Sequence, residues 1–136
     1  MALETTVKTS EPTPHCPFCH LSKERVWIEN EVALALLDSF PVTEGHTLVI
    51  PKHHIPFLFE LPEPELLKVW SLVSEVRKSL KKKYRPDAFN IGVNDGAEAG
   101  QTIAHAHIHV IPRRKGDVQD PRGGVRWIFP NKAIYW

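Results

Sequence analysis

The chain has 136 residues, of which 42% are hydrophobic, and this is enough to bury one core in a single domain. Its net charge of +1 argues against broad electrostatic capture of nucleic acid or of an anionic membrane. No apolar run is long enough for a transmembrane helix, and the first fourteen residues lack the apolar stretch of a signal peptide. We therefore expect a cytoplasmic protein that binds no nucleic acid and no membrane, with a disordered tail at 1–14 and one domain at 15–136.

Apolar runs bounded by turn residues predict five strands, at 26–29, 32–37, 46–51, 88–93 and 103–112. One helix is predicted at 62–83, because proline and acids suit a first turn and lysines suit a last turn. Its expected buried face, near the 3.6-residue period, is Leu66, Trp70, Val73, Val76 and Leu80. One helix between several strands predicts an α+β fold with a largely antiparallel sheet, followed by an irregular tail at 116–136.

The segment AHAHIHV places His105, His107 and His109 at alternate positions of a predicted strand. Side chains on a strand alternate between faces, so the imidazoles share one face and the intervening apolar residues share the other. Neighbours on a face are roughly 7 Å apart, so one metal ion could hold two of the histidines but hardly all three. Three interpretations compete: a solvated histidine face, a three-histidine zinc hydrolase with a ligand from elsewhere, and a catalytic site that handles phosphate.

The loop NDGAEAGQT, which precedes the histidines, favours the phosphate interpretation. Gly96 and Gly100 allow the backbone to approach an anion closely, and a turn of backbone N–H groups can hold one. A neutral imidazole beside such a loop can attack phosphorus and form a covalent intermediate that water later opens. Neutral donors in the loop are Asn94, Gln101 and Thr102.

The two cysteines, Cys16 and Cys19, are separated by two residues. In a reducing compartment this spacing favours metal binding or a redox pair over a structural disulfide. Two thiolates need two more ligands to complete a tetrahedral zinc site, and the chain offers His53 or His54 together with His105. A redox dithiol and two free buried thiols are the alternatives.

The run GQTIAHAHIHVIPR, with the segments LLD and GHTLVIPKHH before it, resembles the signature of the histidine triad (HIT) superfamily. The resemblance covers about residues 15–115, and several separate segments agree in order. The ends of the motif are closer to the bacterial HIT and fragile-histidine-triad branch than to the Hint branch. The resemblance implies a HIT-like α+β fold and a homodimer whose two sheets join.

The resemblance also implies a role for each histidine and for one acid. His107 would be the nucleophile on the α-phosphorus, and His109 would contact the phosphate and assist departure of the leaving group. His46 would support these histidines through hydrogen bonds, and Asp38 would hold the ribose hydroxyls, since a carboxylate can accept from a vicinal diol. The implied phosphate loop is Asn94, Gly100, Gln101 and Thr102, and the base pocket is expected near Trp27, Ile28, Leu36 and Leu37.

By the same resemblance, the zinc ligands would be Cys16, Cys19, His54 and His105, with His53 the near alternative to His54. Such a zinc would be structural, because all four of its positions are filled. No organic cofactor is implied.

The resemblance implies a nucleotide hydrolase or nucleotidyl transferase. It would act on the α-phosphate of dinucleoside polyphosphates or related AMP derivatives through a nucleotidyl-His107 intermediate. A nucleoside phosphoramidase and a nucleotide-binding protein without turnover are the alternatives. In the C-terminal tail, Arg126, Trp127 and Trp136 are candidates either for a pocket wall or for ordinary packing.

Overall fold

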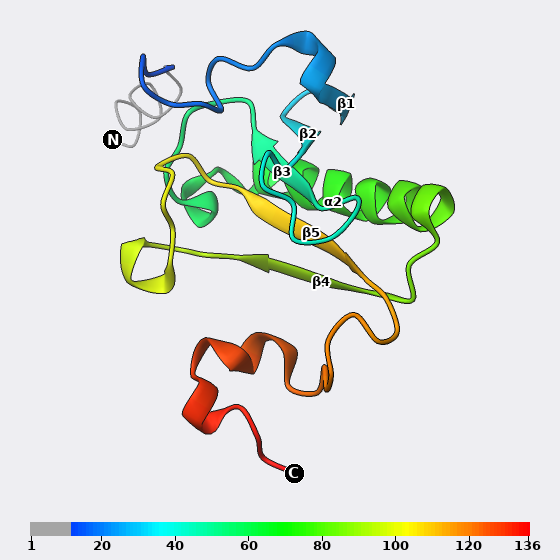
Figure 1. Cartoon of the computed structure of the whole chain (residues 1–136). Coiled ribbons are helices and arrows are strands. Elements are labelled where there is room, and N and C mark those ends of the chain that lie inside the picture. The colour runs from blue at the N-terminus through cyan, green and yellow to red at the C-terminus, as the bar shows by residue number, and fades with distance from the viewer. Residues whose placement is uncertain (1–11) are drawn as a thin grey trace.

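The computed structural model describes residues 12–136, so most of the tail predicted at 1–14 lies outside the described residues. In this part of the chain, α2 (Glu63–Tyr84) covers one face of a five-stranded sheet (Figure 1). The strands have the order β1-β2-β3-β5-β4, and every neighbouring pair is antiparallel. They are β1 (Val26–Glu29), β2 (Ala33–Leu37), β3 (Thr47–Pro51), β4 (Ala88–Val93) and β5 (Ile108–Arg113). The predicted α+β fold is confirmed.

Helix α2 follows the predicted span within one residue at each end. Acids occupy its first turn and lysines its last, where they suit the helix dipole, and it ends where Arg85 turns left-handed at φ 52°. The prediction of its buried face was partly wrong, because Leu66 and Trp70 are only half-buried. A helix lying across a broad sheet buries a wide stripe, and its fully buried residues are Val69, Leu72, Val73, Val76 and Leu80.

Strand β5 is shorter than the predicted strand at 103–112, because it begins only at Ile108. Both neighbouring strands end their pairing opposite Ile108, so the residues before it have no ladder to join. Instead, the Ala106 N–H donates to the carbonyl of Ile55, at 2.7 Å. The alternation nevertheless continues through this segment, since Ala106 is buried in the core with Ile108 and Val110.

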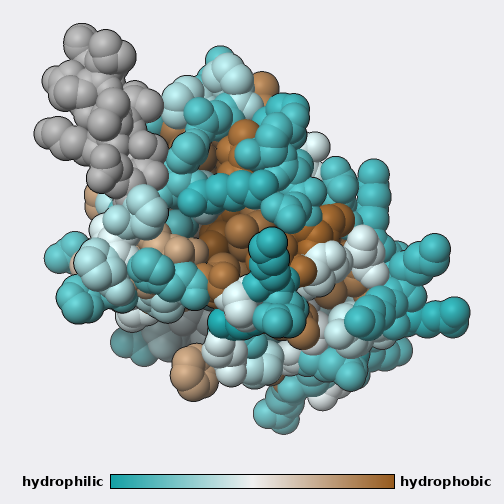
Figure 2. Space-filling model, turned by 90° about the horizontal axis from the view of Figure 1, so that it is seen from above, coloured by the Kyte–Doolittle hydropathy of each residue, from teal (hydrophilic) through white to brown (hydrophobic). Residues whose placement is uncertain are grey.

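Strand β3 is buried along its whole length because both faces of the sheet are covered there. One face packs against α2. On the other face, Leu36, Leu48 and Ile50 form a second apolar cluster with Phe18 and Leu21 of the N-terminal segment. Seen from above, apolar surface lies in a hollow framed by hydrophilic side chains (Figure 2).

The remaining segments are short. After β5 the chain runs below β4, where the predicted irregular tail contains two turns of 3-10 helix (Figure 1). No helix among residues 12–136 is both long and apolar enough to cross a membrane. The 3-10 helices are η1 (Lys23–Arg25), η2 (Leu58–Glu60), η3 (Ala97–Ala99), η4 (Gly124–Ile128) and η5 (Pro130–Lys132).

Candidate functional site

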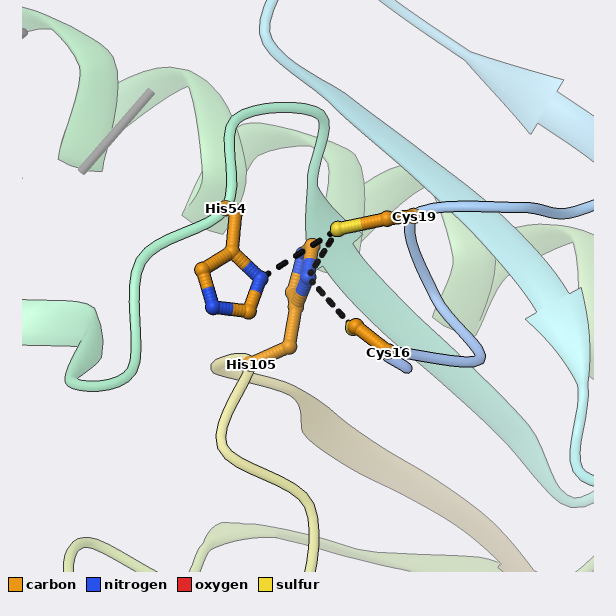
Figure 3. A group of neighbouring side chains, drawn as sticks. All are labelled: Cys16, Cys19, His54 and His105. Carbon is orange, nitrogen blue, oxygen red and sulfur yellow. Dashed lines mark hydrogen bonds between the residues drawn. The ribbon is translucent and has the colours of Figure 1, made fainter. Parts of the chain in front are cut away.

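Four side chains from three separate segments converge beside the start of β5 (Figure 3). Their potential ligand atoms all lie within 4.8 Å of one another, and they belong to Cys16, Cys19, His54 and His105. The Cys19 Sγ lies 3.2 Å from Nδ1 of His54, and the Cys16 Sγ lies 3.4 Å from Nδ1 of His105. A thiolate and an imidazole that share one zinc ion are separated by roughly 3.5 Å. His53 is exposed and takes no part in this cluster, so the geometry favours His54.

The protonation of His105 also fits a metal ligand. Its Nε2 lies 2.9 Å from the carbonyl oxygen of Pro51, which can only accept, so Nε2 carries the proton. The lone pair of the neutral ring is therefore on Nδ1, which faces both cysteines. Burial lowers the pKa of His105 to about 4 and raises the pKa of the Cys16 thiol. A buried thiolate needs a cation beside it, so this donor set fits zinc.

His107 lies against this cluster and has the opposite tautomer. Its Nδ1 lies 2.9 Å from the backbone oxygen of His105, so Nδ1 donates and Nε2 holds the lone pair. The Phe18 ring packs edge-on against His107, with centroids 5.3 Å apart. The His107 side chain is buried but retains slight exposure, at 8%. A fixed lone pair at the edge of an open site is the arrangement a nucleophile needs.

A second group of potential ligands, His46, His109 and Asp38, forms a hydrogen-bond relay. The Val42 N–H donates to Nδ1 of His46 at 3.1 Å, so the proton of a neutral His46 is on Nε2. This Nε2 lies 3.0 Å from Nδ1 of His109 and 3.4 Å from Asp38 Oδ2. Nδ1 of His109 therefore accepts, which leaves an Nε2–H that can donate to a substrate.

The same tautomers argue against a metal ion in this relay. Nε2 of His46 would have to lose its proton to bind a metal, and the proton would then move to Nδ1, facing the Val42 N–H. Burial lowers the pKa of both rings, and that of His109 falls to about 4. Both rings are therefore neutral near pH 7, as hydrogen-bond donors and acceptors in a relay should be.

The loop at 94–102 differs from the predicted phosphate loop. The Gln101 side chain donates to the carbonyls of Pro56 and Ile103 and accepts from Gly96 N–H, so its amide is fully used within the protein. The N–H groups of residues 99–101 are also used inside the loop. Gln101 therefore braces the loop in this structure, and its contact with phosphate stays a prediction. A Cβ built on Gly100 would lie 3.9 Å from the Asn94 side chain, and Thr102 is exposed.

The four residues predicted to form a base pocket do not converge. Leu36 belongs to the cluster that faces Phe18, whereas Ile28 packs against the core under α2. Trp27 and Leu37 line a separate cavity of about 330 Å³ with α2 residues Leu80 and Tyr84. Beside the histidines, Leu36 instead packs in an apolar cluster with residues that the sequence did not single out, Phe18 and Leu21.

Phe18 could have been found from the sequence. It lies between the two cysteines, so any metal that joins them to His105 also brings Phe18 to the histidines.

Of the three candidates in the C-terminal tail, only one lies beside the histidines. Trp127 lines a cavity that also contains His46 and His109. Arg126 instead donates to carbonyls of its own segment, and Trp136 packs against Arg122.

Known proteins are similar to this chain in sequence and in fold. The family model for the HIT domain matches residues 21–116. The chain is 37% identical over 115 residues to the adenylylsulfatase HINT3 of Arabidopsis thaliana, covering 82% of this chain and 58% of that protein. It is 36% identical over 96 residues to the asymmetrical bis(5'-nucleosyl)-tetraphosphatase of Schizosaccharomyces pombe, covering 71% of this chain and 53% of that protein. The chain thus spans little more than half the length of these two relatives.

Solved structures agree with this similarity. The crystal structure of a zinc-bound histidine triad family protein from Mycobacterium smegmatis has a TM-score of 0.69 to this chain and 36% sequence identity. The match covers 78% of this chain and 80% of that one.

Proposed function

Because this chain belongs to the HIT domain family, whose relatives include nucleotide hydrolases, we propose that it hydrolyses AMP derivatives at the α-phosphate, with dinucleoside polyphosphates as the substrate class. The observation that carries this proposal is the pair of opposite tautomers on neighbouring histidines. His107 offers a lone pair and His109 offers an N–H, and their ring centroids are 5.2 Å apart. A nucleophile and a donor are thus positioned around one phosphoryl group.

In the first step, Nε2 of His107 attacks the α-phosphorus and the bond from phosphorus to the leaving oxygen breaks. The electron pair leaves with that oxygen, to which the His109 Nε2–H donates a hydrogen bond. The nucleotidyl-His107 ring carries a positive charge, which its Nδ1–H shares with the carbonyl of His105. Water then attacks phosphorus and loses a proton to solvent, and the P–N bond electrons return to Nε2.

The protonation of His109 determines which class of leaving group the site favours. Since its pKa is lowered to about 4, this ring is neutral near pH 7 and donates a hydrogen bond without transferring its proton. A phosphate chain departs as an anion and needs no proton, whereas an amine must be protonated before it leaves. The site therefore favours an anhydride over a phosphoramidate.

The AMP part of the substrate would bind on the face of the sheet opposite α2. Asp38, half-buried at the end of β2, accepts the Phe40 N–H through Oδ1 and is the proposed acceptor for the ribose hydroxyls. The base would lie against the apolar cluster of Leu36 and Phe18. Asn94 remains the proposed phosphate contact of the loop, because it lines the same cavity as His109.

The test compares the wild-type chain with His107→Asn, using diadenosine triphosphate and adenosine 5'-phosphoramidate as substrates. Wild type should release AMP from both substrates, faster from the first, and an acid-quenched sample should show an AMP adduct on His107 by mass spectrometry. Equal turnover by the variant would remove His107 as nucleophile. Tight AMP binding without any turnover would instead support a nucleotide-binding protein, and faster cleavage of the phosphoramidate would support a phosphoramidase.

Two further properties follow from the same family and stay proposals. We propose that zinc at the cluster of Figure 3 is structural, since four protein ligands leave no open position. We also propose a homodimer whose two sheets join at an edge strand, β1 or β4. Light scattering on the purified chain checks this, and a monomer at micromolar concentration would contradict it.

A further inference from the structure

We infer that the leaving group of the substrate binds in a cavity closed by the C-terminal segment, where its aromatic ring stacks on Trp127. This inference rests on the proposed hydrolase function and adds what the leaving group must contain. The cavity has a volume of about 800 Å³, which exceeds the needs of one phosphate. It begins at His46 and His109 and extends along β4 and β5 to Trp127. Anything attached to the attacked phosphorus on the His109 side must therefore enter it.

The floor of the cavity is open beside the catalytic histidines. Gly92 of β4 pairs directly with His109 of β5, and the next pair along the same face is Asn90 with Ile111. A Cβ built on Gly92 would meet no atom within 4 Å, so the missing side chain leaves empty space next to His109. Gly92 has no unusual backbone angle that would require glycine. Glycine therefore matters here for its small size, which leaves room in the cavity beside His109.

The far wall of the cavity contains an aromatic ring flanked by aliphatic side chains. The Trp127 indole N–H donates to the carbonyl of Arg122 at 2.8 Å, which fixes the ring, and the side chain stays 41% exposed. Val118 and Val125 flank it in the cavity wall. A fixed, accessible indole surrounded by aliphatic side chains is suited to a planar ring.

The acids of this wall do not repel a phosphate chain, because each has an arginine partner. Asp117 accepts two hydrogen bonds from Arg113, and this pairing strongly lowers the pKa of Asp117. Asp120 is paired with Arg122 in the same way. A short phosphate linker can therefore cross from His109 to Trp127. The class of leaving group that fits is a nucleoside, or another aromatic group, carried on phosphate.

Trp127 lies beyond residues 21–116, which match the family model. The HIT domain would thus supply the chemistry, and the added segment would select the leaving group. Trp136 of the same segment is a natural control, because it is equally exposed, at 42%, but packs against Arg122 and does not line the cavity.

The experiment uses two substrates of equal charge with the same attacked phosphorus: diadenosine triphosphate and the γ-methyl ester of ATP. Their leaving groups differ only in whether they end in adenosine or methyl, and diadenosine triphosphate offers two equivalent phosphorus atoms, so a preference of two-fold is expected without any recognition. Wild type should prefer diadenosine triphosphate in kcat/KM, and Trp127→Ala should reduce that preference about ten-fold, the size of one lost stacking contact. Trp136→Ala should leave the preference at its wild-type value.

A second variant keeps the inference testable if Trp127→Ala does not fold. Gly92→Val fills the floor beside His109 and should also reduce the preference for the adenosine-bearing substrate. A wild-type preference in kcat/KM of two-fold or less, or a preference that neither variant alters, would overturn the leaving-group site while leaving the hydrolase intact. If wild type cleaves neither substrate, the proposed function fails and this inference fails with it.

Discussion

Replacing Gly45 by alanine should destabilise the chain by much more than the same change at Gly116. Both glycines have positive φ, +89° at Gly45 and +84° at Gly116, so each alanine incurs about 1–2 kcal/mol of backbone strain. Their surroundings differ. A Cβ on Gly45 would lie 2.9 Å from Tyr84 Cδ2 and 3.3 Å from Pro112 Cγ, whereas one on Gly116 would meet nothing within 4 Å.

Overpacking of this kind adds about 1–3 kcal/mol, so we expect Gly45→Ala to cost roughly 2–5 kcal/mol in total. Urea unfolding followed by circular dichroism measures both variants against wild type. Adding Tyr84→Leu to Gly45→Ala should recover part of the loss, and a double-mutant cycle isolates this contact. If Gly45→Ala costs no more than Gly116→Ala, the packing of α2 against the loop before His46 is not as described.

Three other changes test separate parts of the site. His54→Ala should lower zinc from about one ion per chain to near zero by elemental analysis, while His53→Ala should retain it; zinc retained in both variants would exclude His54 as a ligand. Since the pKa of His109 is lowered to about 4 in the folded state, the unfolded chain binds more protons between pH 6.5 and 4. The contribution of His109 to the free energy of unfolding should therefore fall, by at most about 3 kcal/mol, as the pH drops through this window, and His109→Gln should reduce the slope. Leu36→Ala should cost about 2–5 kcal/mol and raise KM, because Leu36 is fully buried beside the proposed base site, whereas Leu37→Ala should leave KM unchanged.

Much of the fold follows from local rules, and the failures have physical causes. The bounds of β1 and β4 agree with the expected strands at 26–29 and 88–93, since short apolar runs there are bounded by turns. The first residue of β5 could not be predicted from the sequence, because a strand extends only as far as its neighbours can pair with it. The end of pairing opposite Ile108 is a property of the neighbouring strands and leaves no mark in the segment itself.

The candidate site shows the same division. The cluster of two cysteines and two histidines was predictable because these residue types are distinctive ligands even when 89 residues apart in sequence, and because the family resemblance favoured His54 over His53. The base pocket contained an avoidable error: Leu36 and Leu37 are adjacent on one strand, so they must face opposite sides of the sheet. The bracing role of Gln101 was not predictable from the sequence. Its amide is used by the carbonyl of Pro56, a contact between loops that no periodicity encodes.

Main-chain groups determine the tautomers of the central histidines. The Val42 N–H sets His46, the Pro51 carbonyl sets His105, and the His105 carbonyl sets His107. Side-chain substitution cannot delete a backbone N–H or carbonyl, except that proline would remove the N–H at position 42. The pattern of protons can therefore survive extensive sequence divergence as long as the backbone keeps its path. For protein engineering, the residues around these histidines are open to redesign, whereas insertions and deletions that shift the backbone near Val42 or Pro51 are the changes to avoid.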